Sequence, residues 1–303
     1  PYVDLCFHAW SAQKMAEMAE ALGKPERAAF YRERYAGLAE SFAGQFRRDD
    51  GSLSVDTQTA CVLALETGLV AGDDARPVVR QLVERIEAND VRMATGFLGT
   101  KSILPALSAH GHHDLACRLF QSREFPSWGY EVEQGANTVW ERWDSFTKEH
   151  GFEGFTGSNN AAMNSFSHYA FGAVMEWGYR TLAGIDLLEP GYRTIRIRPL
   201  IPSAGSNPDR EPISWVRADY DSPRGLIASH WRRDGRELVM EIVIPANTTA
   251  EVHVPAASLD DVSCGGQQLS AGPAEGVEVR EVTDTAAILS VGSGEYRFTS
   301  RLP

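Results

Sequence analysis

The apolar residues of this chain change their spacing near residues 185–191, and this change constrains the fold more than any other feature of the sequence. Before it, apolar residues recur at helical intervals, as in residues 5–19. After it, apolar and charged residues alternate, as in residues 193–199, which is the pattern of a half-buried strand. A chain of 303 residues is long enough for two domains. We therefore predict a helical domain over residues 1–186 and a β domain over residues 187–303.

Glycine and proline separate the predicted helices. Gly23-Lys24-Pro25 ends the first helix and starts the second, with the proline in the first turn, where it is tolerated. Asp56, and Asp73 or Asp74, are expected to cap two further helices. A long apolar helix is expected over residues 165–183. Because the connections are short, neighbouring helices are expected to form antiparallel hairpins, a repeated architecture without a repeated sequence.

Three segments of the helical domain are too rich in aromatic and polar residues to be simple connectors. They are residues 95–100, 124–130 and 144–164. All three are predicted to be loops. Since functional residues are often carried by loops on a rigid scaffold, these segments are the expected location of a site.

The β domain is predicted to be an antiparallel sandwich of about seven or eight strands. Turn residues at 221–225 and 233–235 are typical of hairpins. Trp215 and Trp231 alternate with polar residues, so both are expected in the strand core. The predicted strands are 193–199, 215–220, 226–232, 238–244, 250–254, 277–282, 286–290 and 294–298.

The run from Gln134 to Asp144 concentrates carboxylate, amide and indole side chains within eleven residues. Glu141 lies in it between Trp140 and Trp143. Indole rings stack well on the apolar face of a sugar, and a carboxylate between two indoles can be tuned for acid–base work. The run therefore indicates carbohydrate chemistry, with Glu141 as the first candidate. The alternative is a buried tryptophan pair at a helix start, with Glu141 paired to Arg142 or another neighbour.

Charge and composition exclude several classes of partner. A net charge of −12 disfavours nucleic acid and anionic membranes, which would repel the chain. The four cysteines are too far apart for a zinc site or a redox pair, and they are expected to be reduced core thiols, which favours a cytoplasmic setting. No apolar run is long enough to span a bilayer, and no signal peptide is visible. His110, His112 and His113 lie around a glycine turn without a carboxylate pair, so no metal or cofactor is expected.

Several separated motifs occur together in one order along the chain. Through them the chain resembles the C-terminal half of bacterial α-L-rhamnosidases of glycoside hydrolase family 78, over residues 1 to about 255. Asn137 stands where that family more often has threonine. The matching segments are Thr95–Thr100, Pro126–Trp128, Gln134–Asp144, Asn164–Val174 and Ile195–Pro199.

The resemblance implies an inverting glycosidase on an (α/α)6 toroid of helical hairpins. In such an enzyme a carboxylic acid protonates the glycosidic oxygen while a carboxylate roughly 6.5–9.5 Å away activates a water on the opposite face of the sugar. Glu141 looks like this general base, and His168 looks like a histidine that contacts the sugar. The resemblance implies a further set of pocket residues, Trp128, Trp140, Trp143 and Asp144.

Each of these residues also has a structural interpretation. His168 can be an ordinary structural histidine, and Trp128 can belong to the core. Trp140 and Trp143 flank Glu141, so at most one of them is expected to face the sugar. Asp144 can simply cap the turn, and Arg142 is expected to orient a carboxylate. Glu131 and Glu133 precede the run closely enough to act, but an exposed loop face explains them equally well.

The resemblance also implies that part of the machinery is missing. In the family the general acid lies in an acidic motif upstream of the segment that matches residue 1. Because the sequence begins with Pro1 rather than methionine, we expect that residue 1 is not the natural N-terminus. We therefore expect residues 1–303 alone to have little or no rhamnosidase activity. The expected ligand is a rhamnose-containing glycoside or oligosaccharide, and the oligomeric state is left open. Two alternatives are a six-hairpin glycosidase for another sugar and a non-catalytic carbohydrate-binding protein.

Overall fold

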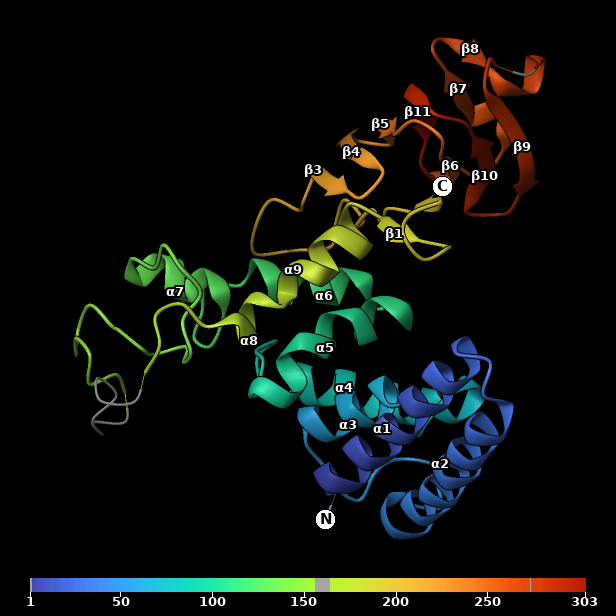
Figure 1. The fold of residues 1–303 in the computed structure, drawn as a ribbon. Helices are drawn as coiled ribbons and strands as arrows, with labels where there is room; N and C mark the ends of the chain where they lie inside the picture. Colours follow the sequence, from blue (N-terminus) through green and yellow to red (C-terminus); the bar gives the residue numbers. More distant parts are fainter. Residues whose placement is uncertain (1, 156–163, 273) are drawn as a thin grey trace. The chain divides into compact units, whose positions relative to one another are not determined.

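The computed structural model describes residues 2–155, 164–272 and 274–303 (Figure 1). The chain forms two compact units, Pro1–Ala173 and Val174–Pro303. The first is helical, and the second consists mainly of strands. This order confirms the predicted fold class, helical hairpins followed by a β-sandwich. The boundary between residues 186 and 187 stays a prediction.

The helical unit is built from consecutive helices that pack in pairs: α1 with α2, α3 with α4, and α5 with α6. In Figure 1 they run from blue through green. α1 ends at Ala21 and is followed by Gly23, whose φ of 64° lies in the left-handed region that favours glycine, and α2 begins with Pro25. The helices are α1 (Tyr2–Ala21), α2 (Pro25–Phe46), α3 (Gln58–Glu66), α4 (Ala75–Glu87), α5 (Phe97–Ala109), α6 (His113–Gln121), α7 (Trp128–Gln134) and α8 (Tyr169–Gly172).

The predicted caps are only partly right. Thr57, not Asp56, caps α3, because its hydroxyl accepts the Ala60 N–H at 3.1 Å. Asp74 precedes α4 but makes no side-chain cap, since its carboxylate pairs instead with Arg47 at 2.9 Å. A tertiary ion pair has replaced the local hydrogen bond in that case.

The predicted loop at residues 95–100 is wrong from Phe97 onward, because α5 begins there. Residues 124–130 likewise run into α7 at Trp128. The predicted helix over residues 165–183 is also wrong. It is divided into α8, α9 (Val174–Trp177) and a π-helical turn (Gly178–Leu182). Residues 165–168 are not helical, because their backbone groups bond to the segment 139–141.

The β unit contains two sheets. One has the strand order β1-β2-β6-β10-β9 and the other β3-β4-β5-β11-β7-β8. All pairs are antiparallel except β2 with β6, which is parallel. The strands are β1 (Ile185–Leu187), β2 (Thr194–Ile197), β3 (Trp215–Ser222), β4 (Gly225–Asp234), β5 (Glu237–Ile244), β6 (Thr249–Pro255), β7 (Val262–Cys264), β8 (Gln267–Gln268), β9 (Val277–Val282), β10 (Ala286–Val291) and β11 (Gly294–Arg301).

The apolar core of this unit comes from alternating residues on its strands, among them Ile195, Ile242 and Phe298. Trp231 belongs to this core, and its indole N–H donates to the Leu182 carbonyl at 2.7 Å. The expectation that Trp215 also lies in the strand core is wrong, because this residue is 66 % exposed at the start of β3. Alternation alone does not show which face of a strand is covered.

The four cysteines are buried free thiols, as expected. Among the described residues, no helix has the length and apolarity required to pass through a bilayer.

Candidate active site

The run from Gln134 to Asp144 is a loop that follows α7. Ser127 caps the start of α7, where its hydroxyl accepts the Tyr130 N–H at 3.0 Å and donates to the Ser122 carbonyl at 2.9 Å. Gly135 ends the helix with a φ of 104°, a conformation that favours glycine over residues with a side chain. These two caps fix where the loop begins.

The cap of α7 provides a first prediction. Ser127→Ala is expected to lower the free energy of unfolding by about 1 kcal/mol, because the Tyr130 N–H loses its acceptor. Chemical denaturation of the two proteins measures the change. Ser167→Ala is the matched control, because Ser167 is exposed. An equal decrease in the free energy of unfolding of the two variants would contradict the capping role of Ser127.

Glu141 is the most accessible carboxylate of the predicted site. Its side chain is 28 % exposed, and its Oε2 accepts the Ser165 N–H at 2.7 Å. The Glu141 backbone N–H donates in turn to the Ser165 carbonyl at 2.9 Å. Among the described residues Oε1 has no hydrogen-bond partner. One carboxylate oxygen is therefore held in place in a side chain that stays partly exposed. Of the alternative pairings, the Glu141–Arg142 pair is not observed and Arg142 lies against Asp144, but a neighbouring side chain, His168, does lie 3.9 Å from Glu141 Oε2.

His168 lies beside Glu141, as the two predicted roles require. Its Nδ1 is 3.9 Å from Glu141 Oε2, and its backbone N–H donates to the Val139 carbonyl at 2.8 Å. Its ring stacks on Phe97 and on Tyr169, with centroids 5.1 and 5.6 Å apart. Both neighbouring rings are exposed, so the group offers aromatic faces next to a carboxylate.

The sequence interpretation missed Phe97 and Tyr169 as site residues. Both belong to motifs that carried the family resemblance, so a signal was present. Tyr169 was not singled out because it lay in a predicted long helix, and Phe97 lay in one of the segments expected to carry the site but was not named individually. Only the tertiary structure shows that both rings stack with His168.

The three candidate tryptophans hold the loop together. Trp143 is buried and stacks on Phe171 with centroids 3.9 Å apart and planes at 9°. Trp128 meets Trp143 edge-on at 5.4 Å, and its indole N–H donates to the Phe171 carbonyl at 3.0 Å. Trp140 is also buried and meets Phe166 at 5.5 Å. Packing accounts for all these contacts, and direct sugar contacts by the indoles stay a prediction.

Asp144 organises the loop that follows the motif. Its Oδ2 accepts the Phe155 N–H at 3.0 Å, and its Oδ1 lies 3.5 Å from Arg142 Nε. Arg142 therefore orients a carboxylate, as expected. The rest of the predicted loop, residues 156–163, lies outside the described residues. A direct role of Asp144 towards substrate stays a prediction.

Glu131 differs from the expectation of an exposed loop face. It lies on α7 and is only 3 % exposed. Burial raises the pKa of the Glu131 carboxyl to about 8, against a partial opposing effect of the Trp140 backbone N–H. Glu133, on the same helix, is exposed as expected and pairs with Arg123 at 2.7 Å.

Metal binding has no support among the residues that the structure describes. They contain no group of three or more histidine, cysteine, aspartate or glutamate side chains placed to hold an ion. His113 instead lies 3.0 Å from the Ser108 hydroxyl, through its Nδ1.

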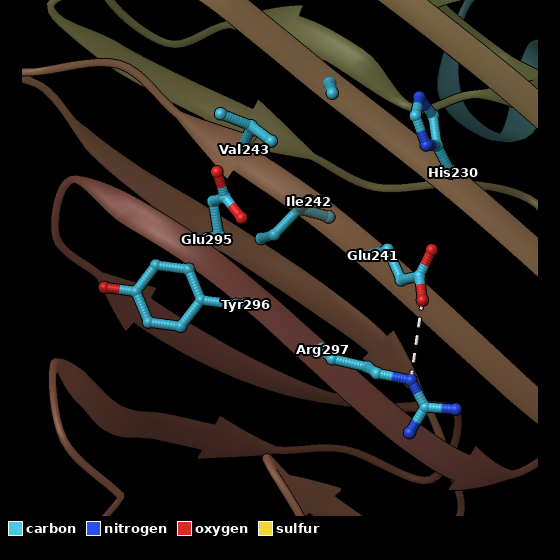
Figure 2. Close-up of a pocket in the computed structure, with 8 residues that line it drawn as sticks. His230, Glu241, Ile242, Val243, Glu295, Tyr296 and Arg297 are labelled. Atoms are coloured by element: carbon cyan, nitrogen blue, oxygen red, sulfur yellow. Dashed lines mark ion pairs between the residues drawn. The ribbon is translucent and has the colours of Figure 1, made fainter.

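The β unit has a hollow of about 410 Å³ on β4, β5 and β11 (Figure 2). Its polar side chains include Glu241 and Arg297, whose charged groups are 3.5 Å apart. Figure 2 shows Tyr296 pointing away from this pair, so the phenol ring does not face it. None of the predicted site residues lines the hollow, and the loop around Glu141 is the better candidate site.

Comparisons with known proteins match both the helical and the β part of the chain. A family model described as the bacterial alpha-L-rhamnosidase 6 hairpin glycosidase domain matches residues 1–182. A second, described as the bacterial alpha-L-rhamnosidase C-terminal domain, matches residues 184–268. An alpha-L-rhamnosidase of Streptomyces avermitilis is 39 % identical over 97 % of this chain and 26 % of its own length. One of Formosa agariphila is 36 % identical over 89 % of this chain and 28 % of its own length.

Solved structures give the same result. The Streptomyces avermitilis alpha-L-rhamnosidase in complex with L-rhamnose has a TM-score of 0.84 and 37 % identity, over 98 % of this chain and 26 % of that one. The Aspergillus terreus enzyme has a TM-score of 0.79 and 27 % identity, over 97 % of this chain and 29 % of that one. The chain spans about a quarter of the length of the curated relatives it matches.

Proposed function

This chain belongs to the bacterial α-L-rhamnosidase family, and from this premise we propose that it supplies the general base for inverting hydrolysis of terminal α-L-rhamnosides. Glu141 is that base. One observation carries the assignment: Glu141 Oε2 is fixed by the Ser165 N–H at 2.7 Å, while the side chain stays 28 % exposed. A carboxylate held in this way can accept a proton from a water that attacks the anomeric carbon.

The neighbours of Glu141 have supporting roles. His168 hydrogen-bonds a sugar hydroxyl from its position 3.9 Å from the carboxylate. Phe97 and Tyr169 offer exposed ring faces on which the apolar face of rhamnose can pack. Trp128, Trp140 and Trp143 shape the site chiefly by fixing the loop, since they pack on other aromatic rings and Trp128 also donates to the Phe171 carbonyl.

The proton for the leaving group comes from a carboxylic acid outside residues 1–303. An inverting hydrolysis needs such an acid opposite the base, at roughly 6.5–9.5 Å.

The reduced cysteines support a cytoplasmic location. Rhamnose-containing glycosides or oligosaccharides are the proposed ligands.

The dependence on an upstream acid gives the test of the function. A polypeptide of residues 1–303 is expected to release no measurable nitrophenol from p-nitrophenyl α-L-rhamnoside, because the leaving group is not protonated. An extended polypeptide, in which the upstream part of the domain precedes residue 1, is expected to be active. Absorbance assays of the two proteins measure this.

A panel of other aryl glycosides is the control for the sugar. Preference of the extended polypeptide for another sugar would show a different six-hairpin glycosidase. Binding of rhamnose without turnover of any glycoside would show a carbohydrate-binding protein. Substantial turnover of the aryl rhamnoside by residues 1–303 alone would contradict the proposal that the general acid lies outside these residues.

A further inference from the structure

The carboxylate of Glu141 is held by a single backbone N–H. Among the described residues, the Ser165 N–H is the only hydrogen-bond donor to this carboxylate, at 2.7 Å. The N–H belongs to the peptide unit that joins Asn164 to Ser165. Because a peptide unit is planar, the direction of its N–H follows the placement of the Cα atoms at its two ends. The contacts that hold Asn164 therefore also aim the donor at Glu141.

The side chain of Asn164 is bound at both of its polar atoms by Ser145. Its Oδ1 accepts the Ser145 hydroxyl at 2.8 Å, and its Nδ2 donates to the Ser145 carbonyl at 3.4 Å. Ser145 is fully buried. A buried hydroxyl has no access to water that could replace a lost partner, so these contacts are costly to break.

Ser145 is bound in turn to Arg142, the residue that follows Glu141. The Arg142 carbonyl lies 2.9 Å from the Ser145 hydroxyl and accepts the Ser145 N–H at 3.1 Å, and the Arg142 N–H donates to the hydroxyl at 3.2 Å. The hydroxyl has one proton for two acceptors, so it lies between the Arg142 carbonyl and Asn164 Oδ1. These contacts close a ring that passes through Glu141, Arg142, Ser145, Asn164 and Ser165.

We propose that Asn164 and Ser145 are positioning residues for Glu141, which together aim the Ser165 N–H at its carboxylate. This role rests on the proposed function of Glu141 as general base. A general base works only within hydrogen-bond reach of the water that it deprotonates, and a small displacement of a reacting group lowers the rate strongly. Neither residue is required to touch the sugar, because both act through the backbone that holds the base.

The first test compares the kinetics of single variants of the extended polypeptide. Asn164→Ala removes both contacts to Ser145 and is expected to lower kcat for p-nitrophenyl α-L-rhamnoside about tenfold with little change in KM. Ser145→Ala is expected to give a similar loss. Asn89→Ala is the matched control, because Asn89 is exposed and also donates to a backbone carbonyl, that of Arg92 at 3.0 Å. The control is expected to keep the wild-type kcat.

The second test repeats Asn164→Ala in a protein that already carries Glu141→Gln. With no base left to aim, the substitution is expected to lower the residual kcat less than about twofold, against about tenfold in the wild-type background. A structural role, in which the pocket as a whole is damaged, would lower kcat by the same factor in both backgrounds. Equal factors would therefore overturn the positioning role.

A milder variant keeps the test decisive if the alanine chain does not fold. Asn164→Asp retains an acceptor for the Ser145 hydroxyl at the 2.8 Å contact and loses only the donor of the 3.4 Å contact. It is expected to lower kcat about threefold in the wild-type background and to leave the residual kcat of Glu141→Gln unchanged. Thermal unfolding followed by circular dichroism shows which chains are folded at the assay temperature.

The outcomes separate this role from the proposed function. If the wild type is active, Glu141→Gln has lost its activity and the Asn164 and Ser145 variants keep the wild-type kcat, the positioning role is wrong and the base assignment stands. If the extended wild type hydrolyses no aryl glycoside, the proposed function fails and the positioning role fails with it.

Discussion

Glu141→Gln is expected to lower kcat for p-nitrophenyl α-L-rhamnoside by about 10²–10⁴-fold in the extended polypeptide. The amide is close in size and shape to the carboxylate, and its oxygen can still accept the Ser165 N–H that holds Oε2 at 2.7 Å. It cannot accept a proton from the attacking water, so the rate of the chemical step falls while the binding of substrate is retained. KM is expected to change little, since an interaction made only in the transition state lowers kcat alone.

Two measurements make this result specific. Glu133→Gln carries the same substitution at an exposed position of α7, and it is expected to retain wild-type activity. NMR of the first product released by the wild type is expected to show β-L-rhamnose, because an inverting reaction reverses the anomeric configuration. A loss below tenfold in Glu141→Gln, or α-L-rhamnose as first product, would contradict Glu141 as the base.

Trp143→Ala is expected to have the largest effect on stability, about 3–5 kcal/mol. The substitution removes a buried indole that stacks on Phe171 at 3.9 Å and meets Trp128 edge-on at 5.4 Å. The space left is lined by rigid rings that cannot readily collapse into it. The midpoint of thermal unfolding is expected to fall by about 10 °C, measured by circular dichroism.

The same substitution also distinguishes packing from sugar contact. Trp143→Phe keeps an aromatic ring against Phe171 and is expected to restore most of the stability. If the indole only packs, the Phe variant retains KM for the aryl rhamnoside. A large rise in KM with normal stability would instead show that Trp143 contacts the sugar.

Local pattern was enough to predict most of the elements in this chain. The helices of the first unit follow the spacing of their apolar residues, and Gly23 and Pro25 mark one hairpin turn. The hairpins at residues 221–225 and 233–235 lie where their turn residues predict. The short strands β1, β7 and β8 were not predicted, because an alternation of apolar and polar residues cannot be recognised over only two or three residues.

Where a segment bonds to a distant part of the chain, its local pattern was misleading. Residues 165–168 lie in an apolar, helix-like stretch, yet their backbone groups bond to Val139 and Glu141. Asp74 has the residue type of a helix cap, yet it pairs with Arg47. In both cases a tertiary partner satisfies the polar groups that a helix or a cap would otherwise have used.

The sequence by itself determined the order of a helical and a β unit, the family, and Glu141 and His168 as the leading candidates, because these depend on residue type and local spacing. The tertiary structure alone decided what surrounds each of them. It placed His168 Nδ1 3.9 Å from Glu141 and stacked its ring on Phe97. It also buried Glu131 while leaving Glu133, two residues further on, in water. Burial depends on which distant segments cover a side chain, and that is a property of the packed chain that no local pattern records.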